Sequence, residues 1–223
     1  MDDHPTLEAR AAVHAALGEP HRLAICDALA LSDRSPSELG TMLAIPSNLL
    51  AHHLAVLEAA GLLATVRSSG DGRRRYVHLL PHRTEGASPA HSLTARSVLF
   101  VCKHNSARSQ LAAALWRSAS SIPATSAGTE PAPQVHPGAA RVAARHGLDL
   151  GAARPRLIET GARPDLLVTV CDEANESLTL GGRLARLHWS VPDPVAAPTA
   201  RAFEDALEDI AERIELLAAA TAA

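Results

Sequence analysis

The sequence is poor in aromatic residues, lysine and cysteine. Only 2% of the 223 residues are aromatic, so a hydrophobic core must be built mainly from aliphatic side chains and alanine. No apolar run approaches the roughly 20 residues that span a bilayer, and the acidic start MDDHPTLEAR does not resemble a signal sequence. We therefore expect a soluble, cytoplasmic protein with no membrane partner.

The charge balance and the cysteines exclude a polycationic nucleic-acid-binding protein, a disulfide-rich protein and a cysteine-type zinc protein. With 21 basic and 24 acidic residues the formal net charge is −3, so any nucleic-acid binding must come from local placement of charge. The three cysteines, Cys26, Cys102 and Cys171, form neither a disulfide framework nor a zinc-type pair, so each is structural or reactive. The composition, 47% hydrophobic and 20% charged, is that of an ordinary globular protein.

The length suggests one large domain or two small ones. Residues 81–95 are polar and aperiodic and contain two prolines and a glycine. We therefore predict a linker there, between a first domain over residues 1–80 and a second over residues 96–223.

The first domain has helical patterns followed by two strand-like segments, 63–67 and 73–79, which the turn residues SSGDG separate. This order predicts an α+β winged helix-turn-helix. Four helices are predicted. The first ends near Leu17, and the second runs from about His21 to Leu31. The third begins at the capping box SPSE of residues 35–38, and the fourth begins at Pro46–Ser47 and ends before Gly61.

The second domain alternates strands and helices. Such alternation predicts an α/β domain whose small parallel sheet is flanked by helices, with its reactive groups at the carboxyl ends of the strands. The predicted strands are 97–101, 124–127, 165–170 and 187–191, and the predicted helices are 109–118, 137–146 and 200–219.

The segment between the first strand and helix of this domain has the composition of an anion site. A loop that leads into a helix points several backbone N–H groups at one spot, and the helix dipole favours negative charge there, including the thiolate of Cys102. Arg108 could hold a tetrahedral oxyanion through two hydrogen bonds, and Ser109 could donate its hydroxyl to the sulfur. The predicted oxyanion-binding loop consists of Lys103, His104, Asn105, Ser106, Ala107, Arg108 and Ser109.

Four motifs in order resemble the low-molecular-weight protein tyrosine phosphatase superfamily, which includes one class of arsenate reductases. They are VCKHNSARSQ, TSAGT, HPG followed by RHGLD, and the late Asp-Pro. The resemblance implies that Cys102 is the nucleophile, that Asn105 braces the loop, and that Asp193 is the general acid. A carboxyl group is a plausible proton donor for expelling water or an alcohol, although an ordinary Asp-Pro turn is the alternative.

The second thiol bears on the choice between a reductase and a phosphatase. Cys171 directly follows a predicted strand, so it lies on the same sheet edge as Cys102, where it could release arsenite and leave a Cys102–Cys171 disulfide. A small apolar residue at the end of a buried strand is the alternative. Gln110, the pair His188-Trp189 and the absence of tyrosine from this domain favour the reductases by resemblance.

One departure concerns the reductant. The thioredoxin-coupled reductases have a third cysteine where this sequence has Leu178. We expect no bound cofactor, and an external thiol reductant of the thioredoxin, mycothiol or glutaredoxin type. Lys103 either adds positive potential for the oxyanion or is simply solvated.

Residues 6–80 resemble the arsenic-responsive ArsR/SmtB-type repressors, through ALGEPHRLAICDAL, SPSELGTML and PSNLLAHHLAVLEAAGLL. The resemblance implies a double-stranded operator as partner. The recognition helix starts near Ser47, and arginines of the hairpin reach phosphates or the minor groove. The predicted DNA-contacting residues are Ser47, Asn48, Ala51, His52, Arg67, Arg73, Arg74 and Arg75.

The sequence differs from the ArsR/SmtB-type repressors at positions that bear on DNA binding and on the dimer interface. Leu49, Ala51, Ala55 and Glu58 replace polar or basic residues, and fewer phosphate contacts mean weaker binding. The family's closing dimer helix is absent, although palindromic operators still favour a homodimer.

No metal site is predicted. The Cys-x-Cys of the family's metalloid site is missing, and Cys26 is expected in the core. The neighbours His52 and His53 point to different faces of one helix, which is poor geometry for chelation, and His53 is expected to pack against other helices.

These observations predict a transcriptional regulator that is also a thiol-dependent arsenate reductase and forms a cysteine–arsenate adduct on Cys102. Two alternatives stay open. One is a phosphatase of phosphotyrosine or small phosphoesters tethered to a winged helix. The other is a repressor that senses an oxyanion or redox state without catalysis.

Overall fold

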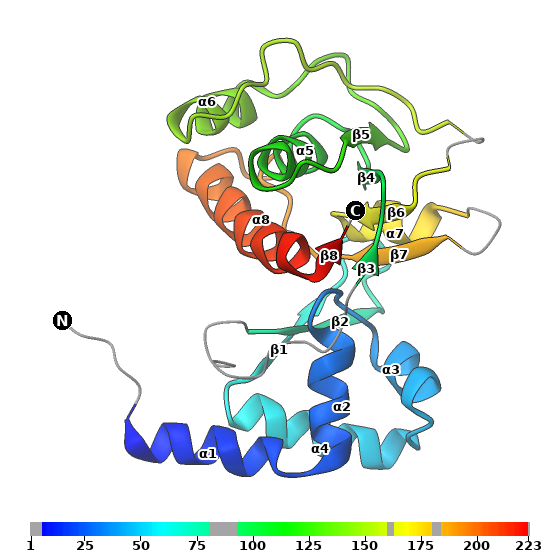
Figure 1. Cartoon of the computed structure of the whole chain (residues 1–223), viewed down its shortest axis with the longest axis vertical. Coiled ribbons are helices and arrows are strands. Elements are labelled where there is room, and N and C mark those ends of the chain that lie inside the picture. The colour runs from blue at the N-terminus through cyan, green and yellow to red at the C-terminus, as the bar shows by residue number, and fades with distance from the viewer. Residues whose placement is uncertain (1–5, 81–92, 160–162, 180–183, 223) are drawn as a thin grey trace. The chain divides into compact units, whose positions relative to one another are not determined.

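The computed structural model describes residues 6–80, 93–159, 163–179 and 184–222. The chain divides into two compact units, which are described one at a time (Figure 1). Most of the predicted linker, residues 81–92, lies outside the described residues. Leu93 and Thr94, at its end, form the short strand β3 (Leu93–Thr94), which pairs in parallel with β8 (Thr221–Ala222).

The first unit is a helix-turn-helix followed by a β-hairpin, as predicted. The strands pair antiparallel in a register that joins Leu63 to Leu79 and Arg67 to Arg75. Its elements are α1 (Leu7–Leu17), α2 (Pro20–Leu29), α3 (Pro36–Leu43), α4 (Ser47–Ala59), β1 (Leu63–Arg67) and β2 (Arg75–Leu79).

Local chemistry explains where these helices begin and end. Ser35 and Glu38 form the predicted capping box, with the Ser35 hydroxyl accepting from the Glu38 N–H at 3.3 Å and the Glu38 carboxylate accepting from the Ser35 N–H at 2.7 Å. Gly61 has φ 71°, the left-handed conformation that ends a helix. Helix α2 stops two residues before the predicted Leu31, and β2 starts two residues after the predicted residue 73.

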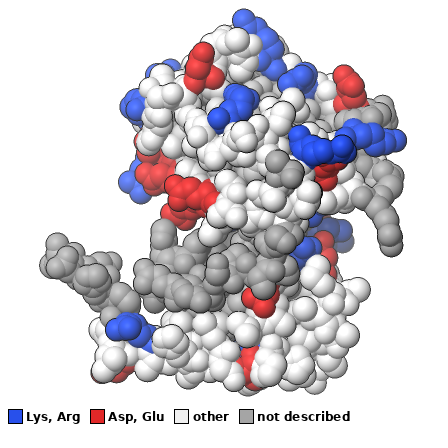
Figure 2. Space-filling model, in the orientation of Figure 1, with Lys and Arg blue, Asp and Glu red and all other residues white. Residues whose placement is uncertain are grey.

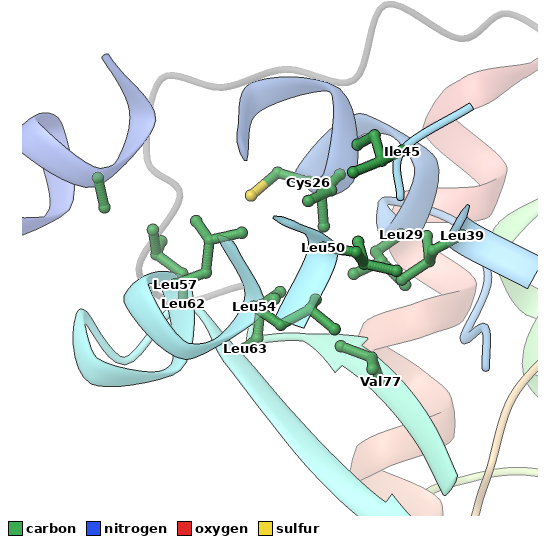
Figure 3. Packing of buried hydrophobic residues seen from close by; sticks show 12 residues of the cluster. Cys26, Leu29, Leu39, Ile45, Leu50, Leu54, Leu57, Leu62, Leu63 and Val77 are labelled. Atoms are coloured by element: carbon green, nitrogen blue, oxygen red, sulfur yellow. The ribbon is translucent and has the colours of Figure 1, made fainter. Parts of the chain in front are cut away.

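The core of the first unit is aliphatic, as the composition requires. Leu50, Leu54 and Leu57 project inward from α4 at helical spacing. Leu50 lies beside Leu39 of α3, whereas Leu57 lies beside Leu62 (Figure 3). Cys26 lies among them with 4% of its surface exposed, so its prediction as a core residue is confirmed.

Within the described residues, no single helix is long and apolar enough to cross a membrane. Helices α3 and α4 meet the length and composition criteria only when taken as a pair, and their axes are bent by 113°.

The second unit is built on a parallel sheet, as the alternation predicted, and its four strands lie in the order β5-β4-β6-β7. Its strands are β4 (Val98–Cys102), β5 (Ala124–Gly128), β6 (Leu166–Thr169) and β7 (Ala185–His188). The last strand lies earlier in the sequence than the predicted 187–191. Residues 189–191 are buried after the strand has ended, and such burial gives the same apolar signal as a strand.

Helices flank this sheet. Helices α5, α6 and α8 lie together on one side of the strands in Figure 1, and α7 packs on β4 and β6. Phe100 of β4 contacts Trp116 and Trp189, with ring centroids 6.1 and 5.9 Å apart, and these rings fill the centre of the unit. The helices are α5 (Arg108–Ala119), α6 (Pro137–Arg145), α7 (Asp172–Ser177), which was not predicted, and α8 (Ala200–Ala220).

Candidate active site

The predicted anion loop connects the central strand β4 to α5. Cys102 is the last residue of β4 and Arg108 is the first of α5, so the five residues between them form the loop. Cys102 and Arg108 are each 2% exposed, and Ser109 is fully buried. The loop therefore ends in the interior of the unit, at the carboxyl edge of the sheet.

The backbone carbonyls of the loop are bound by the segment that follows β5. The carbonyls of residues 102, 103, 104 and 106 accept N–H groups of residues 129, 130, 132 and 136, at 2.8 to 3.2 Å. In a planar trans peptide the N–H points away from the carbonyl, so this fixation turns loop amides toward the opposite side. Asn105 adds a left-handed residue with φ 47°, and alternation of backbone handedness makes such loops concave toward an anion.

Gly128 explains why the TSAGT motif lies beside this loop. A Cβ at that position would lie 2.6 Å from the Lys103 carbonyl oxygen and 3.0 Å from the Asn105 Cβ. Only a residue without a side chain lets β5 approach the loop this closely.

Asn105 is the brace of the loop, as the family resemblance implied. Its amide nitrogen donates to the Ser109 hydroxyl at 2.8 Å, and its side-chain oxygen accepts the Arg156 N–H at 3.0 Å. The Gln110 amide donates to the same oxygen at 3.2 Å and to the Asn105 carbonyl at 3.1 Å. These bonds hold a buried amide in one orientation and fix the strained backbone around it.

The sulfur of Cys102 is surrounded by hydrogen-bond donors. The Asn105 N–H donates to it at 3.2 Å, and the Ser109 hydroxyl oxygen lies 3.1 Å away. Because Ser109 already accepts from Asn105, its own proton is available for the sulfur. The sulfur is thus held in place by hydrogen-bond donors from the loop and from the first turn of α5.

Arg108 joins the loop to the predicted general acid. One guanidinium nitrogen donates to the Val191 carbonyl at 2.9 Å, and another lies 3.2 Å from a carboxylate oxygen of Asp193. The Arg108 side chain is almost completely buried, whereas that of Asp193 is 26% exposed. Asp193, which is distant in sequence, thus reaches the residue that opens α5.

Cys171 lies at the same loop. Its sulfur accepts the N–H of Lys103, the neighbour of Cys102, at 3.2 Å, and the N–H of Ala174 at 3.4 Å. It is fully buried and caps α7. Burial raises the pKa of this thiol to about 12, although the nearby positive charge of Arg108 opposes the rise.

A buried pair of polar side chains, His188 and Asp172, lies next to Cys171 and was not predicted. His188 at the end of β7 approaches Asp172 with 3.2 Å between its Nε2 and a carboxylate oxygen, and its Nδ1 lies 3.1 Å from the Thr169 hydroxyl. Burial tends to raise the pKa of Asp172, but hydrogen bonds from His188 and Ser190 outweigh it and hold that pKa below its usual value. The only sequence signal was that Asp172 follows a buried strand and His188 ends another.

Two loop residues face outward. Lys103 Nζ lies 3.8 Å from the Glu130 carboxylate, so its charge is partly offset, and the exposed His104 ring lies 2.9 Å from the Glu130 carbonyl oxygen. Leu178, the position at which the sequence lacks the third cysteine of the thioredoxin-coupled reductases, caps the end of α7.

In the first unit, all eight predicted DNA-contacting residues are exposed. Four of them lie on the first two turns of α4, and the arginines lie on or beside the β1–β2 hairpin. On the face shown in Figure 2, the surface around α1, α2 and α4 is mostly uncharged. Among the eight predicted residues only the four arginines are always positively charged, so contact with phosphates would depend mainly on them.

A cysteine at the end of a central parallel strand, facing an amide-lined loop and an arginine, is the arrangement of enzymes that attack tetrahedral oxyanions through sulfur. The second unit is of this class. More particularly, the chain belongs to the low molecular weight phosphotyrosine protein phosphatase family, whose model matches residues 97–223. A helix-turn-helix domain model matches residues 17–66. Both resemblances drawn from the sequence are thereby confirmed.

Solved structures similar to the chain include both arsenate reductases and phosphatases. An arsenate reductase from Archaeoglobus fulgidus is 35% identical, with 55% of this chain and 98% of that chain covered and a TM-score of 0.49. An arsenate reductase in its oxidized state is 25% identical, with 56% and 97% covered and a TM-score of 0.50. Wzb from Vibrio vulnificus, in complex with benzylphosphonate, is 20% identical, with 56% and 98% covered and a TM-score of 0.50.

Proposed function

We propose that the second unit reduces arsenate to arsenite with two thiols, and that the first binds operator DNA. The observation that carries the first part is the position of Cys171, whose sulfur is hydrogen-bonded to the residue next to Cys102. A phosphatase needs one thiol, whereas a reductase needs a second sulfur within reach of the first. The similarity to an arsenate reductase in its oxidized state supports this choice.

The first step forms a sulfur–arsenic bond. The Cys102 thiolate attacks arsenate held by the loop amides and Arg108, and an oxygen leaves as water after protonation by Asp193. Asp193 is suitably placed for this role because it contacts Arg108, which would hold the same oxyanion. As the adduct forms, Cys102 loses its negative charge and arsenic remains pentavalent.

The second step transfers two electrons to arsenic. Cys171, as the thiolate, attacks the Cys102 sulfur and forms a disulfide, and the sulfur–arsenic electron pair leaves with arsenite. The pKa of Cys171 is raised mainly by burial, with a further contribution from Cys102. Arsenylation neutralises Cys102 and removes that contribution, so Cys171 becomes easier to ionise once the adduct exists. An external dithiol or low-molecular-weight thiol then reduces the disulfide.

The test compares two activities in one pair of proteins. We expect Cys171→Ser to abolish arsenate-dependent thiol consumption and to leave hydrolysis of a chromogenic phosphoester unchanged, because Cys102, Arg108 and Asp193 remain. Cys26→Ser is the matched control, since Cys26 lies in the core of the other unit. Undiminished arsenate turnover by the Cys171 variant would eliminate the two-thiol mechanism.

Phosphoester hydrolysis is the second candidate function. The family that the chain belongs to is named for it, and Cys102, Arg108 and Asp193 are sufficient for it. Phosphoester hydrolysis by a wild-type protein that consumes no thiol in the presence of arsenate would favour this candidate. If neither activity is found but arsenate alters operator binding, the second unit would be a sensor.

The proposal for the first unit rests on the exposed face of α4 and on the hairpin arginines. We propose that a homodimer presents two such faces to a palindromic operator. Replacement of Arg73, Arg74 and Arg75 by Ala should weaken binding to all sequences about equally and flatten its salt dependence, because these residues would meet phosphates. A gel-shift titration at several salt concentrations measures both effects.

A further inference from the structure

Three polar side chains of the first unit, from the start of α2 and from α4, converge on one another. Glu19 precedes α2 and caps it, His21 lies in its first turn, and His53 projects from α4 toward both. The His21 Nδ1 lies 2.8 Å from one carboxylate oxygen of Glu19, and the His53 Nδ1 lies 3.5 Å from the other. One ligand atom from each residue lies within 4.8 Å of those of the other two.

His53 is the unusual member of this cluster. It is 5% exposed, and among the described residues neither of its ring nitrogens has a hydrogen-bond partner. A buried polar group without a partner is costly, so such a group calls for an explanation. The His53 ring stacks on the His21 ring, with centroids 5.3 Å apart and planes 16° apart, so both Nδ1 atoms face the Glu19 carboxylate.

We propose that Glu19, His21 and His53 bind a divalent transition-metal ion of the zinc type. Two imidazoles and one carboxylate are a common protein ligand set for zinc, with water in the remaining position. Ligands about 2.0–2.1 Å from a tetrahedral ion lie about 3.3 Å from one another. The separations of 2.8 and 3.5 Å lie on either side of this value, so small side-chain movements suffice.

The charges of the cluster suit a cation. The Glu19 carboxylate is the acidic group of the cluster, and its hydrogen bonds to His21 and to the Arg22 N–H hold it toward the two imidazoles. Capping alone uses one Glu19 oxygen, at 2.9 Å from the Arg22 N–H, and leaves His53 unexplained.

The histidine pair His52-His53 suggested no metal site because its two rings point to different faces, and that remains true. His52 is exposed, whereas His53 meets ligands that lie more than 30 positions earlier in the sequence. The site connects α2 to α4, so it would clamp the predicted recognition helix to the helix behind it.

The experiment titrates the reduced full-length protein with Co²⁺ and Zn²⁺. We expect one Co²⁺ per chain to give visible bands without the thiolate-to-metal charge-transfer band that cysteine ligands would produce, and Zn²⁺ to displace it. His21→Ala and Glu19→Gln should weaken Zn²⁺ binding at least about tenfold, because even the loss of an outer-shell partner costs about 10–100-fold. His14→Ala, at an exposed histidine of α1, is the matched control and should bind as the wild type does.

His53→Ala should have the same effect, with folding checked by circular dichroism because His53 is buried. If that variant does not fold, His21→Ala decides, since the His21 side chain is 52% exposed. The absence of Co²⁺ binding, a spectrum dominated by thiolate ligation, or unchanged affinity in the His21 and Glu19 variants would overturn the proposal.

Discussion

The oxyanion loop and the cluster of Glu19, His21 and His53 illustrate two ways of preparing a place for an ion. In the loop, four carbonyls are bound by the segment after β5, and the amides that remain supply the donors. In the cluster, the groups that would bind the ion are three side chains, from the start of α2 and from α4. The loop therefore depends on what packs behind it, whereas the cluster depends on the identity of its own side chains.

The largest expected effect comes from the sulfur itself, the one group of the loop that backbone packing cannot replace. Cys102→Ser should abolish both arsenate turnover and phosphoester hydrolysis, because a hydroxyl in that place is a much weaker nucleophile than a thiolate. The measurement is thiol consumption and chromophore release under identical conditions. Substantial residual turnover of either kind would remove Cys102 from the mechanism. Protection of the wild-type thiol from alkylation by phosphate, arsenate or vanadate would show that the loop holds the oxyanion.

The next effect concerns Asp193, a side chain that reaches the loop from outside it. Asp193→Asn keeps the shape but removes the proton donor, and the loss of a general acid typically lowers rates by about 10²–10⁴-fold. Rate measurements on the arsenate and phosphoester reactions test this. The loop amides and Arg108 are unchanged, so phosphate should still protect Cys102 from alkylation. Loss of that protection would mean that Asp193 organises the loop through Arg108 rather than donating a proton.

A substitution at Gly128 tests whether the oxyanion loop depends on the close packing of β5 against it. In Gly128→Ala the new methyl group must displace the Lys103 carbonyl or Asn105, and a displacement of about 1 Å at a reacting centre costs about 10²-fold in rate. Gly18→Ala is the control, because a Cβ there meets only ordinary contacts at 3.5 and 3.6 Å. Wild-type kinetics in the Gly128 variant would show that the loop keeps its function when its packing against β5 is disturbed.

The same contrast explains how far the sequence alone could lead. The loop was predicted because its nucleophile, arginine and serine are contiguous between a strand and a helix, and Asn105 and Gly128 belong to recognisable motifs. The position of Cys171 at the sheet edge followed from the parallel topology. The pair of Asp172 and His188 and the cluster around His53 were missed, because their members are separated in sequence and meet only through packing.

The predicted bounds of the last strand, 187–191, were wrong because a buried loop has the same apolar pattern as a strand. Trp189 and Val191 are apolar and residues 189–191 are buried, yet β7 ends at His188 and the chain continues toward Asp193 as a loop that supplies the Val191 carbonyl to Arg108. Hydrophobic runs report burial, and only backbone pairing distinguishes a strand from a buried loop.

The smallest effect separates the stability of the first unit from the chemistry of the second. Ser35→Ala removes the capping box at α3 and should lower the free energy of unfolding of the first unit by about 0.5–2 kcal/mol, since one helix N–H loses its acceptor. Denaturant unfolding followed by circular dichroism measures it. Thr41→Ala is the control, because the exposed Thr41 hydroxyl only bonds back to the Ser37 carbonyl of the same helix. Arsenate turnover should be unchanged in both variants, because the oxyanion loop draws its fixed carbonyls and its brace from the second unit alone. A fall in turnover that follows the loss of stability would instead show that the first unit supports the loop.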